Sequence, residues 1–273
     1  MRTEIYYFSG TGNSLYVAKE LQKLIPETNL IPIVSLLNKD VIETNAETTG
    51  FVFPIYYMAI PTPVKNFIKK LDLKSTKYIF AITTRLGTPH SAFTDIDKIL
   101  KKKGRHLDSH FALTMANNDP KYDYKVPTTE EIKSFESVID ENLDVIHKII
   151  KKKKISREKD TTITEPVPPL IVSIVPFLNS IFRPIGELFG FKSHYYADSK
   201  CTGCGTCEKV CLSKKIKMLN GKPVWQKNVK CFYCYACINY CPKESVQIKS
   251  FTEKNGRYPH PYAIANDIAG QKH

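Results

Sequence analysis

The sequence predicts an α/β protein in two unequal parts: a domain built on a doubly wound, five-stranded parallel sheet, and a small C-terminal α+β domain rich in cysteine. Apolar strand-like segments alternate with amphipathic helix-like segments through the first 150 residues, which is typical of a parallel sheet covered by helices. All eight cysteines lie between Cys201 and Cys241. The net charge of +13 is uneven, because residues 1–150 carry 19 basic against 18 acidic side chains and residues 151–273 carry 21 against 9.

Hydrophobic periodicity gives the order of the elements in the first part. Strands are expected at residues 3–8, 30–34, 50–55, 77–83 and 110–115. Helices are expected at residues 13–24, 62–71, 91–103 and 128–152. Ligands of such a sheet bind beyond the carboxyl ends of its strands. The segments expected at that edge are residues 9–14, 54–61, 83–87 and 116–119.

The loop SGTGNS, residues 9–14, joins the first strand to the first helix and is suited to a single phosphate group. Its two glycines allow the backbone to approach a ligand closely, and the following helix dipole favours an anion. The lysine-containing P-loop pattern and the G-x-G-x-x-G pattern are both absent. We therefore expect a phosphate monoester, held without a cation by side chains of the loop. These side chains are Ser9, Thr11, Asn13 and Ser14.

The stretch IYYFSGTGNSLYVAKEL resembles the phosphate loop of flavodoxins, with Ser14 in place of the usual threonine. The resemblance covers about the first 150 residues and implies a flavodoxin-like fold that binds FMN. It implies that PIYYMAIP and TTRLGT contact the flavin, with Tyr56 or Tyr57 stacked on the isoalloxazine ring and Arg85 stabilising its reduced anion. Ordinary packing of the tyrosines and a solvated Arg85 are the alternatives. The implied flavin contacts are Ser9, Gly10, Thr11, Gly12, Asn13, Ser14, Pro54, Tyr56, Tyr57, Met58, Thr83, Thr84, Arg85, Gly87 and Asn117.

The cysteines form two motifs with the same spacing, C-x2-C-x2-C-x3-C, at residues 201–211 and 231–241. In two-cluster ferredoxins each such motif gives three ligands to one [4Fe–4S] cluster and its fourth cysteine to the other. A zinc site would leave two cysteines of each motif unexplained. We assign one cluster to Cys201, Cys204, Cys207 and Cys241, and the other to Cys231, Cys234, Cys237 and Cys211. Four aromatic residues are expected to shield the second motif from water, with ordinary packing and a role as an electron relay as alternatives: Phe232, Tyr233, Tyr235 and Tyr240.

Residues 194–250 resemble bacterial-type ferredoxins, with Leu212 where that pattern often has proline. The expected organisation is a flavodoxin-like FMN domain at 1–154, an apolar bridge at 155–193, a two-cluster domain at 194–250 and a tail at 251–273. The uncharged run of the bridge is too short to span a membrane and is broken by Pro176. We expect it to be buried between the domains, with peripheral membrane attachment or a dimer contact as alternatives. Whether the tail folds back is left open.

Location and partners follow from charge and cysteine usage. The apolar stretch at residues 5–8 is too short for the core of a signal peptide, and clustered cysteines suit a reducing compartment, so a cytoplasmic protein is expected. No transmembrane segment is expected. Part of the positive charge compensates the negative clusters, and the rest would steer an acidic redox protein such as a ferredoxin, a flavodoxin or an oxidoreductase. Nucleic-acid binding is not expected, because no recognised motif accompanies the charge. The oligomeric state is left open.

The whole chain resembles the flavodoxin–ferredoxin fusion proteins of anaerobes. The resemblance implies electron transfer between two [4Fe–4S] clusters and one FMN for an external redox partner. The alternative is an FMN-dependent reductase of a small-molecule acceptor, to which the clusters deliver electrons. Arg85, His90 and Asn117 would then orient or protonate the acceptor, although no catalytic acid–base pair stands out in the sequence.

Overall fold

The structure is a computed structural model that describes residues 2–56, 59–87, 91–121, 124–157 and 195–273. Five parallel strands form the main sheet, in the order β2-β1-β4-β6-β7. Their bounds are β1 (Thr3–Tyr7), β2 (Thr28–Pro32), β4 (Thr48–Pro54), β6 (Tyr78–Arg85) and β7 (Ser109–Thr114). Two short strands, β3 (Ile42–Glu43) and β5 (Leu71–Asp72), pair with each other beside it. The main sheet has the flavodoxin-like strand order, so the predicted fold is confirmed.

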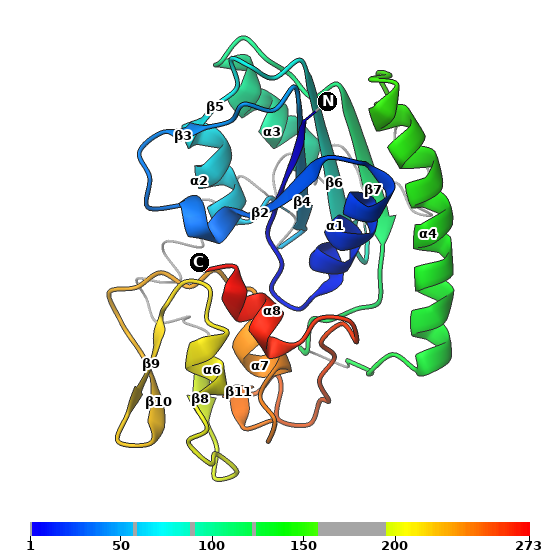
Figure 1. Cartoon of the computed structure of the whole chain (residues 1–273). Helices are drawn as coiled ribbons and strands as arrows, with labels where there is room; N and C mark the ends of the chain where they lie inside the picture. The colour runs from blue at the N-terminus through cyan, green and yellow to red at the C-terminus, as the bar shows by residue number, and fades with distance from the viewer. Residues whose placement is uncertain (1, 57–58, 88–90, 122–123, 158–194) are drawn as a thin grey trace.

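Helices cover both faces of the sheet. Figure 1 shows α1 (Asn13–Leu24) and α4 (Thr129–Lys151) on one side, and α2 (Thr62–Lys70) and α3 (Ala92–Lys101) on the other. Contacts join α1 to α4 and α2 to α3. The helix α4 begins in a capping box, in which Thr128 accepts from the Glu131 N–H and the Glu131 carboxylate accepts in return. All four helices lie within two residues of the predicted bounds.

The second strand differs from the prediction. It was expected at residues 30–34 from its apolar residues, but β2 ends at Pro32 and a 3₁₀ helix, η1 (Ile33–Leu36), follows. Because β2 lies at the edge of the sheet, its residues are only partly buried and carry no clear alternation. Proline is tolerated there, since an edge strand does not need every N–H for pairing.

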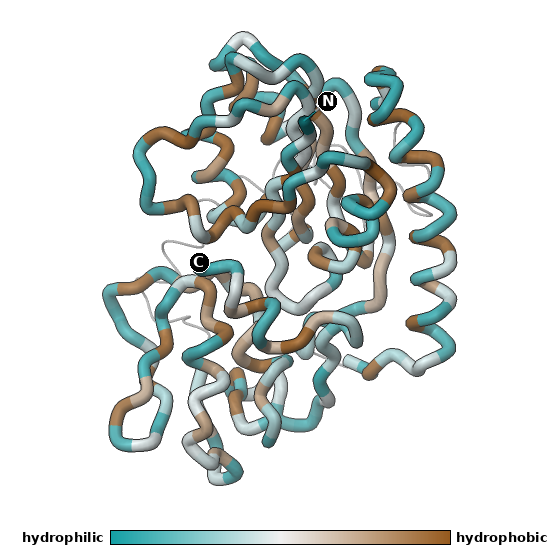
Figure 2. Tube along the Cα trace, viewed as in Figure 1, coloured by the Kyte–Doolittle hydropathy of each residue, from teal (hydrophilic) through white to brown (hydrophobic). Residues whose placement is uncertain are grey.

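The core follows the central strands. Every residue of β6 is buried, and α4 buries a single stripe of aliphatic side chains at Ile139, Leu143, Ile146 and Ile150. Figure 2 shows α4 as alternating hydrophobic and hydrophilic bands, as expected for a helix with one face on the sheet. Among the described residues, none of the helices combines the length and the apolar character needed to cross a membrane.

The cysteine-rich part is an internal repeat of 30 residues. Each cysteine motif contains one turn of helix, α6 (Thr206–Lys209) or α7 (Ala236–Asn239), and is followed by a strand, β9 (Ile216–Leu219) or β11 (Val246–Ile248). The first strand forms a hairpin with β10 (Lys222–Trp225), and β11 pairs antiparallel with β8 (Tyr195–Ala197). This repeated α+β unit lies directly below the sheet in Figure 1.

The tail folds back between the two parts, which answers the question left open by the sequence. Its helix α8 (Ala265–Gly270) sits between the sheet domain and the cysteine-rich unit in Figure 1. The buried side chain of Gln271 accepts from the Ser9 N–H at 3.0 Å and donates to the Ser9 carbonyl oxygen at 2.7 Å. On the other side the Tyr240 hydroxyl donates to the Ala263 carbonyl at 2.8 Å. The predicted bridge, residues 155–193, falls almost entirely outside the described residues.

Candidate cofactor sites

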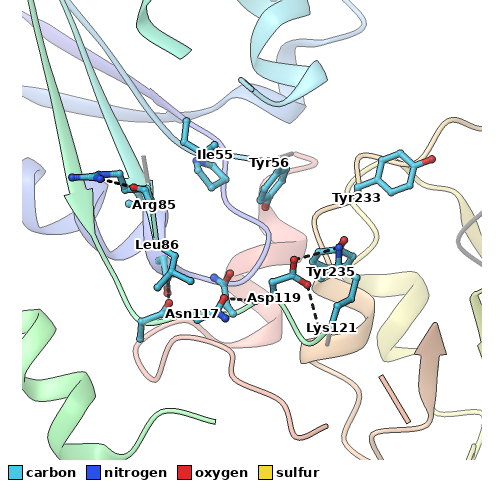
Figure 3. A pocket seen from close by; sticks show the side chains of 15 residues that line it. Ile55, Tyr56, Arg85, Leu86, Asn117, Asp119, Lys121, Tyr233 and Tyr235 are labelled. Carbon is cyan, nitrogen blue, oxygen red and sulfur yellow. Dashed lines mark hydrogen bonds and ion pairs between the residues drawn. The ribbon is translucent and has the colours of Figure 1, made fainter. Parts of the chain in front are cut away.

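A cavity of about 290 Å³ lies at the carboxyl ends of β4, β6 and β7, where the sheet domain meets the second cysteine motif (Figure 3). Its volume is just below the range for small-molecule sites, about 300 to 1,000 Å³. This is the edge at which doubly wound sheets bind ligands. The lining residues are Asn13, Pro54, Ile55, Tyr56, Thr84, Arg85, Leu86, Gly87, Ala116, Asn117, Asn118, Asp119, Lys121, Tyr233 and Tyr235.

Seven of the flavin contacts implied by the sequence line this cavity: Asn13, Pro54, Tyr56, Thr84, Arg85, Gly87 and Asn117. Thr83 does not, because successive side chains of β6 point to opposite faces and that of Thr83 is fully buried. Tyr57 and Met58 lie outside the described residues. The Arg85 guanidinium does not stand free in the cavity, since it donates to the Gly87 carbonyl.

The 9–14 loop is enclosed by the rest of the chain, and only Asn13 of its six residues reaches the cavity. A methyl group on Gly10 would lie 2.7 Å from the Cys234 Cβ, and one on Gly12 would lie 2.6 Å from the Cβ atoms of His260 and Ala263. Gly12 also has a φ of 107°, which favours glycine. Both glycines therefore let the cysteine-rich unit and the tail pack directly on the loop.

The loop has the donors that a phosphate group requires. The backbone N–H groups of Thr11, Asn13, Ser14 and Leu15 donate to no other described residue, and α1 begins at this point without a side-chain cap. A helix N-terminus with unsatisfied N–H groups favours an anion. These donors fit the phosphate end of a flavin nucleotide. The Asn13 side-chain carbonyl oxygen is buried without a partner among the described residues, beside the cavity, and as an acceptor it suits a hydroxyl or N–H group of such a ligand and not its phosphate.

Two charged residues of the cavity were missed as site residues. The Asp119 carboxylate lies 3.4 Å from the Lys121 ammonium and accepts from its backbone N–H at 3.3 Å. Burial raises the pKa of Asp119, although the lysine beside it acts in the opposite direction. The segment 116–119 was placed at the correct edge by its position after the last strand, but nothing in its composition marked the pair.

The cysteines fall into two groups in space. Four of them, Cys201, Cys204, Cys207 and Cys241, line one small hollow and are the four assigned to one cluster. Burial raises the pKa of Cys207 to about 11, and the neighbouring Cys241, Cys201 and Cys204 add to this effect. All eight cysteines are free of disulfides.

The second group surrounds Cys234 and Cys237. Burial raises the pKa of both thiols well above the ordinary value, and Cys231 and Cys211 contribute to the rise in each case. Cys207 also contributes to the rise at Cys237. The crossed ligand assignment, in which the fourth cysteine of each motif joins the other motif, stays a prediction. The structure describes no set of three or more acidic, histidine or cysteine side chains suited to a single metal ion.

Comparison with known proteins identifies the cysteine-rich part of the chain. Residues 193–256 match the family model of the 4Fe-4S dicluster domain. That model spans less than half of the chain, and no curated protein matches the sequence.

Solved structures overlap only in part with the chain. A putative flavoprotein from Bacteroides uniformis is 16% identical, with a TM-score of 0.33 over 42% of this chain and 92% of its own. An FMN complex of a flavoprotein from Lactobacillus acidophilus is 16% identical, with a TM-score of 0.32 over 41% and 92%. Rubredoxin oxygen:oxidoreductase from Desulfovibrio gigas is 13% identical, with a TM-score of 0.35 over 56% and 36%. The fold assignment rests on the strand order, and the iron–sulfur assignment rests on the cysteine motifs and the dicluster match.

Proposed function

We propose that this protein is an iron–sulfur flavoprotein that passes electrons between two [4Fe–4S] clusters and FMN for an external redox partner. The observation that carries the proposal is the cavity of Figure 3, one wall of which comes from the sheet domain and another from the second cysteine motif. The two cofactor sites thus share a boundary within one chain.

The residues divide between the two ends of the flavin nucleotide. The N–H groups of the 9–14 loop and of the first turn of α1 would hold the phosphate, and Tyr56, Arg85 and Asn117 would surround the ring system. When bound, FMN can exchange either one or two electrons, whereas each cluster exchanges one. The chain's contribution would be to hold the ring between the sheet edge and the second motif.

The two cluster sites have different exposure. Cys204 in the first motif is exposed, whereas Cys234 in the second lies against Gly10 of the 9–14 loop. We therefore assign the first cluster, held by Cys201, Cys204, Cys207 and Cys241, to exchange with the external partner. The second cluster, held by Cys231, Cys234, Cys237 and Cys211, exchanges with the flavin.

The charge around the first motif supports an acidic redox protein as the partner. Exposed lysines surround it at Lys200, Lys209, Lys214, Lys217, Lys222 and Lys243. Only one of these is held in an ion pair among the described residues, Lys217 with Glu208 at 3.3 Å. Exposed charge of one sign speeds the association of an oppositely charged protein and loses this effect as salt screens it. Electron exchange with an acidic ferredoxin is therefore expected to slow as ionic strength rises.

The test is cofactor analysis of the protein purified without oxygen. About eight irons and one FMN per chain are expected, and full reduction should consume about four electrons. The flavin and the clusters are distinguished by their absorbance during stepwise addition of a reductant. Stoichiometric iron without FMN binding would refute the flavin half of the proposal, and FMN with no iron would refute the other half.

One observation favours a second candidate, the reductase of a small-molecule acceptor. Asp119 lines the cavity with a pKa raised by burial, so it is suited to holding a proton close to a bound acceptor. Turnover of a small acceptor that saturates and falls in Asp119→Asn would favour the reductase. Electron exchange with proteins alone, unchanged in that variant, would favour the carrier.

A further inference from the structure

The two cysteine motifs share a left-handed backbone conformation at two equivalent positions but carry different residues there. In the first motif Gly203 and Gly205 have φ of 73° and 76°. Thirty residues later, Tyr233 and Tyr235 occupy the same left-handed conformation with φ of 55° and 54°. Glycine adopts this conformation freely, whereas a side chain with a Cβ atom is strained in it. The second motif therefore keeps two bulky side chains where its own repeat uses glycine.

Tyr235 is held in place by groups of the sheet domain. Its side chain is 7% exposed and lines the cavity. The Lys121 ammonium lies 5.3 Å from the centre of its ring, within the range of a cation–π contact. Asp119 in turn pairs with Lys121 at 3.4 Å, and Figure 3 shows this acidic and basic pair directly at the ring. The ring position is thus fixed from both parts of the molecule.

Tyr56 forms part of the wall contributed by the sheet domain. A methyl group on Gly10 would lie 2.6 Å from the Tyr56 hydroxyl oxygen and 2.7 Å from the Cys234 Cβ, so all three residues meet at one point. Cys234 is bonded directly to Tyr235 in the chain. The cavity therefore has Tyr56 from the sheet domain and Tyr233 and Tyr235 from the second motif. Of these, Tyr56 and Tyr235 are placed by the same contact between the 9–14 loop and the second motif.

From this arrangement we propose that Tyr235 is a flavin-binding residue, supplied to the sheet domain's site by the iron–sulfur unit. The inference rests on the proposed function and assigns the ring of Tyr235 to contact with the isoalloxazine system. A planar aromatic ring in a cavity wall suits such a contact, because aromatic rings attract each other beyond simple burial of area. The strained backbone conformation is retained because glycine at this position would leave the wall without its ring.

The experiment titrates FMN and riboflavin into the full-length protein after its flavin has been removed and its iron retained. Tyr235→Gly is expected to weaken both ligands by about tenfold, as judged from quenching of flavin fluorescence. The two ligands should be weakened equally, because both have the ring system that Tyr235 contacts and they differ only in the phosphate, which riboflavin lacks. Tyr235→Phe keeps the aromatic ring and is expected to bind both ligands as the unchanged protein does.

Two controls exclude indirect effects. Glycine relieves strain at position 235, so iron content should be unchanged and the variant should remain folded. Glu244→Gly relaxes another left-handed residue of the same repeat, with φ of 47° at an exposed position, and should leave flavin affinity unchanged. Unchanged affinity in Tyr235→Gly, or loss of FMN affinity alone with riboflavin unaffected, would overturn the inference. Failure of the unaltered, iron-replete protein to bind FMN would instead refute the proposed function.

Discussion

The two cysteine motifs have the same spacing and the same left-handed backbone positions, yet the second cysteine of each lies in a different environment. Cys204 of the first motif is open to solvent. Cys234 of the second motif packs on Gly10 of the 9–14 loop, while both motifs contribute to the apolar core of the sheet domain, through Val210 and Ala236. Identical ligand sets are therefore made unequal by what lies around them. This matters because exposure and nearby charge set the potential of a cluster as much as its ligands do.

The largest expected effect is a loss of iron and flavin. It tests whether the two cysteine motifs differ in their contact with the flavin site. Cys204→Ser and Cys234→Ser should each remove about four irons. Only Cys234→Ser should also release the flavin, because without its cluster the second motif cannot hold two tyrosines in left-handed conformations. Iron assay and flavin absorbance on the same sample measure both effects. If the two variants retain the same amount of flavin, the proposed inequality of the motifs is wrong.

The next effect concerns the tail, which covers the 9–14 loop and also contacts the first motif, where the Lys272 ammonium donates to the Lys209 carbonyl oxygen at 2.6 Å. Gln271→Ala leaves both the N–H and the carbonyl of Ser9 without their partners in a buried position. Unsatisfied buried groups cost about 1 to 3 kcal/mol each, so a loss of about 3 kcal/mol in the free energy of unfolding is expected. Denaturant unfolding measures it. The exposed neighbour variant His273→Ala should be neutral, and an equal loss there would contradict the role given to Gln271.

A smaller effect is expected from the contact between the loop and the second motif. Gly10→Ala would place a methyl group against the Cys234 carbonyl oxygen and 2.7 Å from its Cβ. Overpacking of this kind costs about 1 to 3 kcal/mol. Thermal unfolding should show a lower midpoint for Gly10→Ala and no decrease for Gly270→Ala, which has open space around it. A neutral Gly10→Ala would mean that the two parts are not tightly packed at this point.

The smallest effect is a dependence of stability on pH. Burial lowers the pKa of His260 to about 4, whereas an unfolded histidine titrates near 6.5. The unfolded chain therefore binds more protons between these values, and stability should fall as pH decreases through that window.

Glu136 moderates this loss. The Glu136 carboxylate lies 3.7 Å from the His260 Nε2. Burial raises the pKa of Glu136, so as pH falls the folded state binds a proton at this carboxylate more readily than the unfolded chain, which opposes the loss of stability. A net loss of about 1 kcal/mol from pH 7 to pH 5 is expected. Unfolding curves of His260→Gln should lack this loss, whereas the exposed His106→Gln should retain it.

Much of the fold could be predicted because its signals are local. The helix at residues 13–24 was predicted to the residue, since its apolar positions recur at helical spacing after a glycine loop. The spacing of the cysteines likewise indicates [4Fe–4S] ligands from the sequence alone. The packing of the tail over the 9–14 loop could not be predicted, because Gln271 and Ser9 are 262 residues apart and neither belongs to a periodic pattern.

The place of Tyr235 in the cavity wall was also missed, although the sequence contained an indication of it. Aligning the two motifs places Gly205 opposite Tyr235, and a glycine at one copy of a repeat indicates a backbone conformation that the other copy must share. The sequence alone suggested only that the tyrosines shield the second motif. Which surface they face depends on how the two parts dock, and that is a property of the assembled fold.

The long separation between Gln271 and the loop it covers also constrains how the protein is made. The strand and helix that flank residues 9–14 leave the ribosome early and can begin to fold while synthesis continues. The loop is not enclosed until the cysteine-rich unit and α8 have been synthesised and packed against it. A chain interrupted before this stage would have the loop but not the far wall of the cavity, so flavin retention during maturation should depend on completion of the downstream segments.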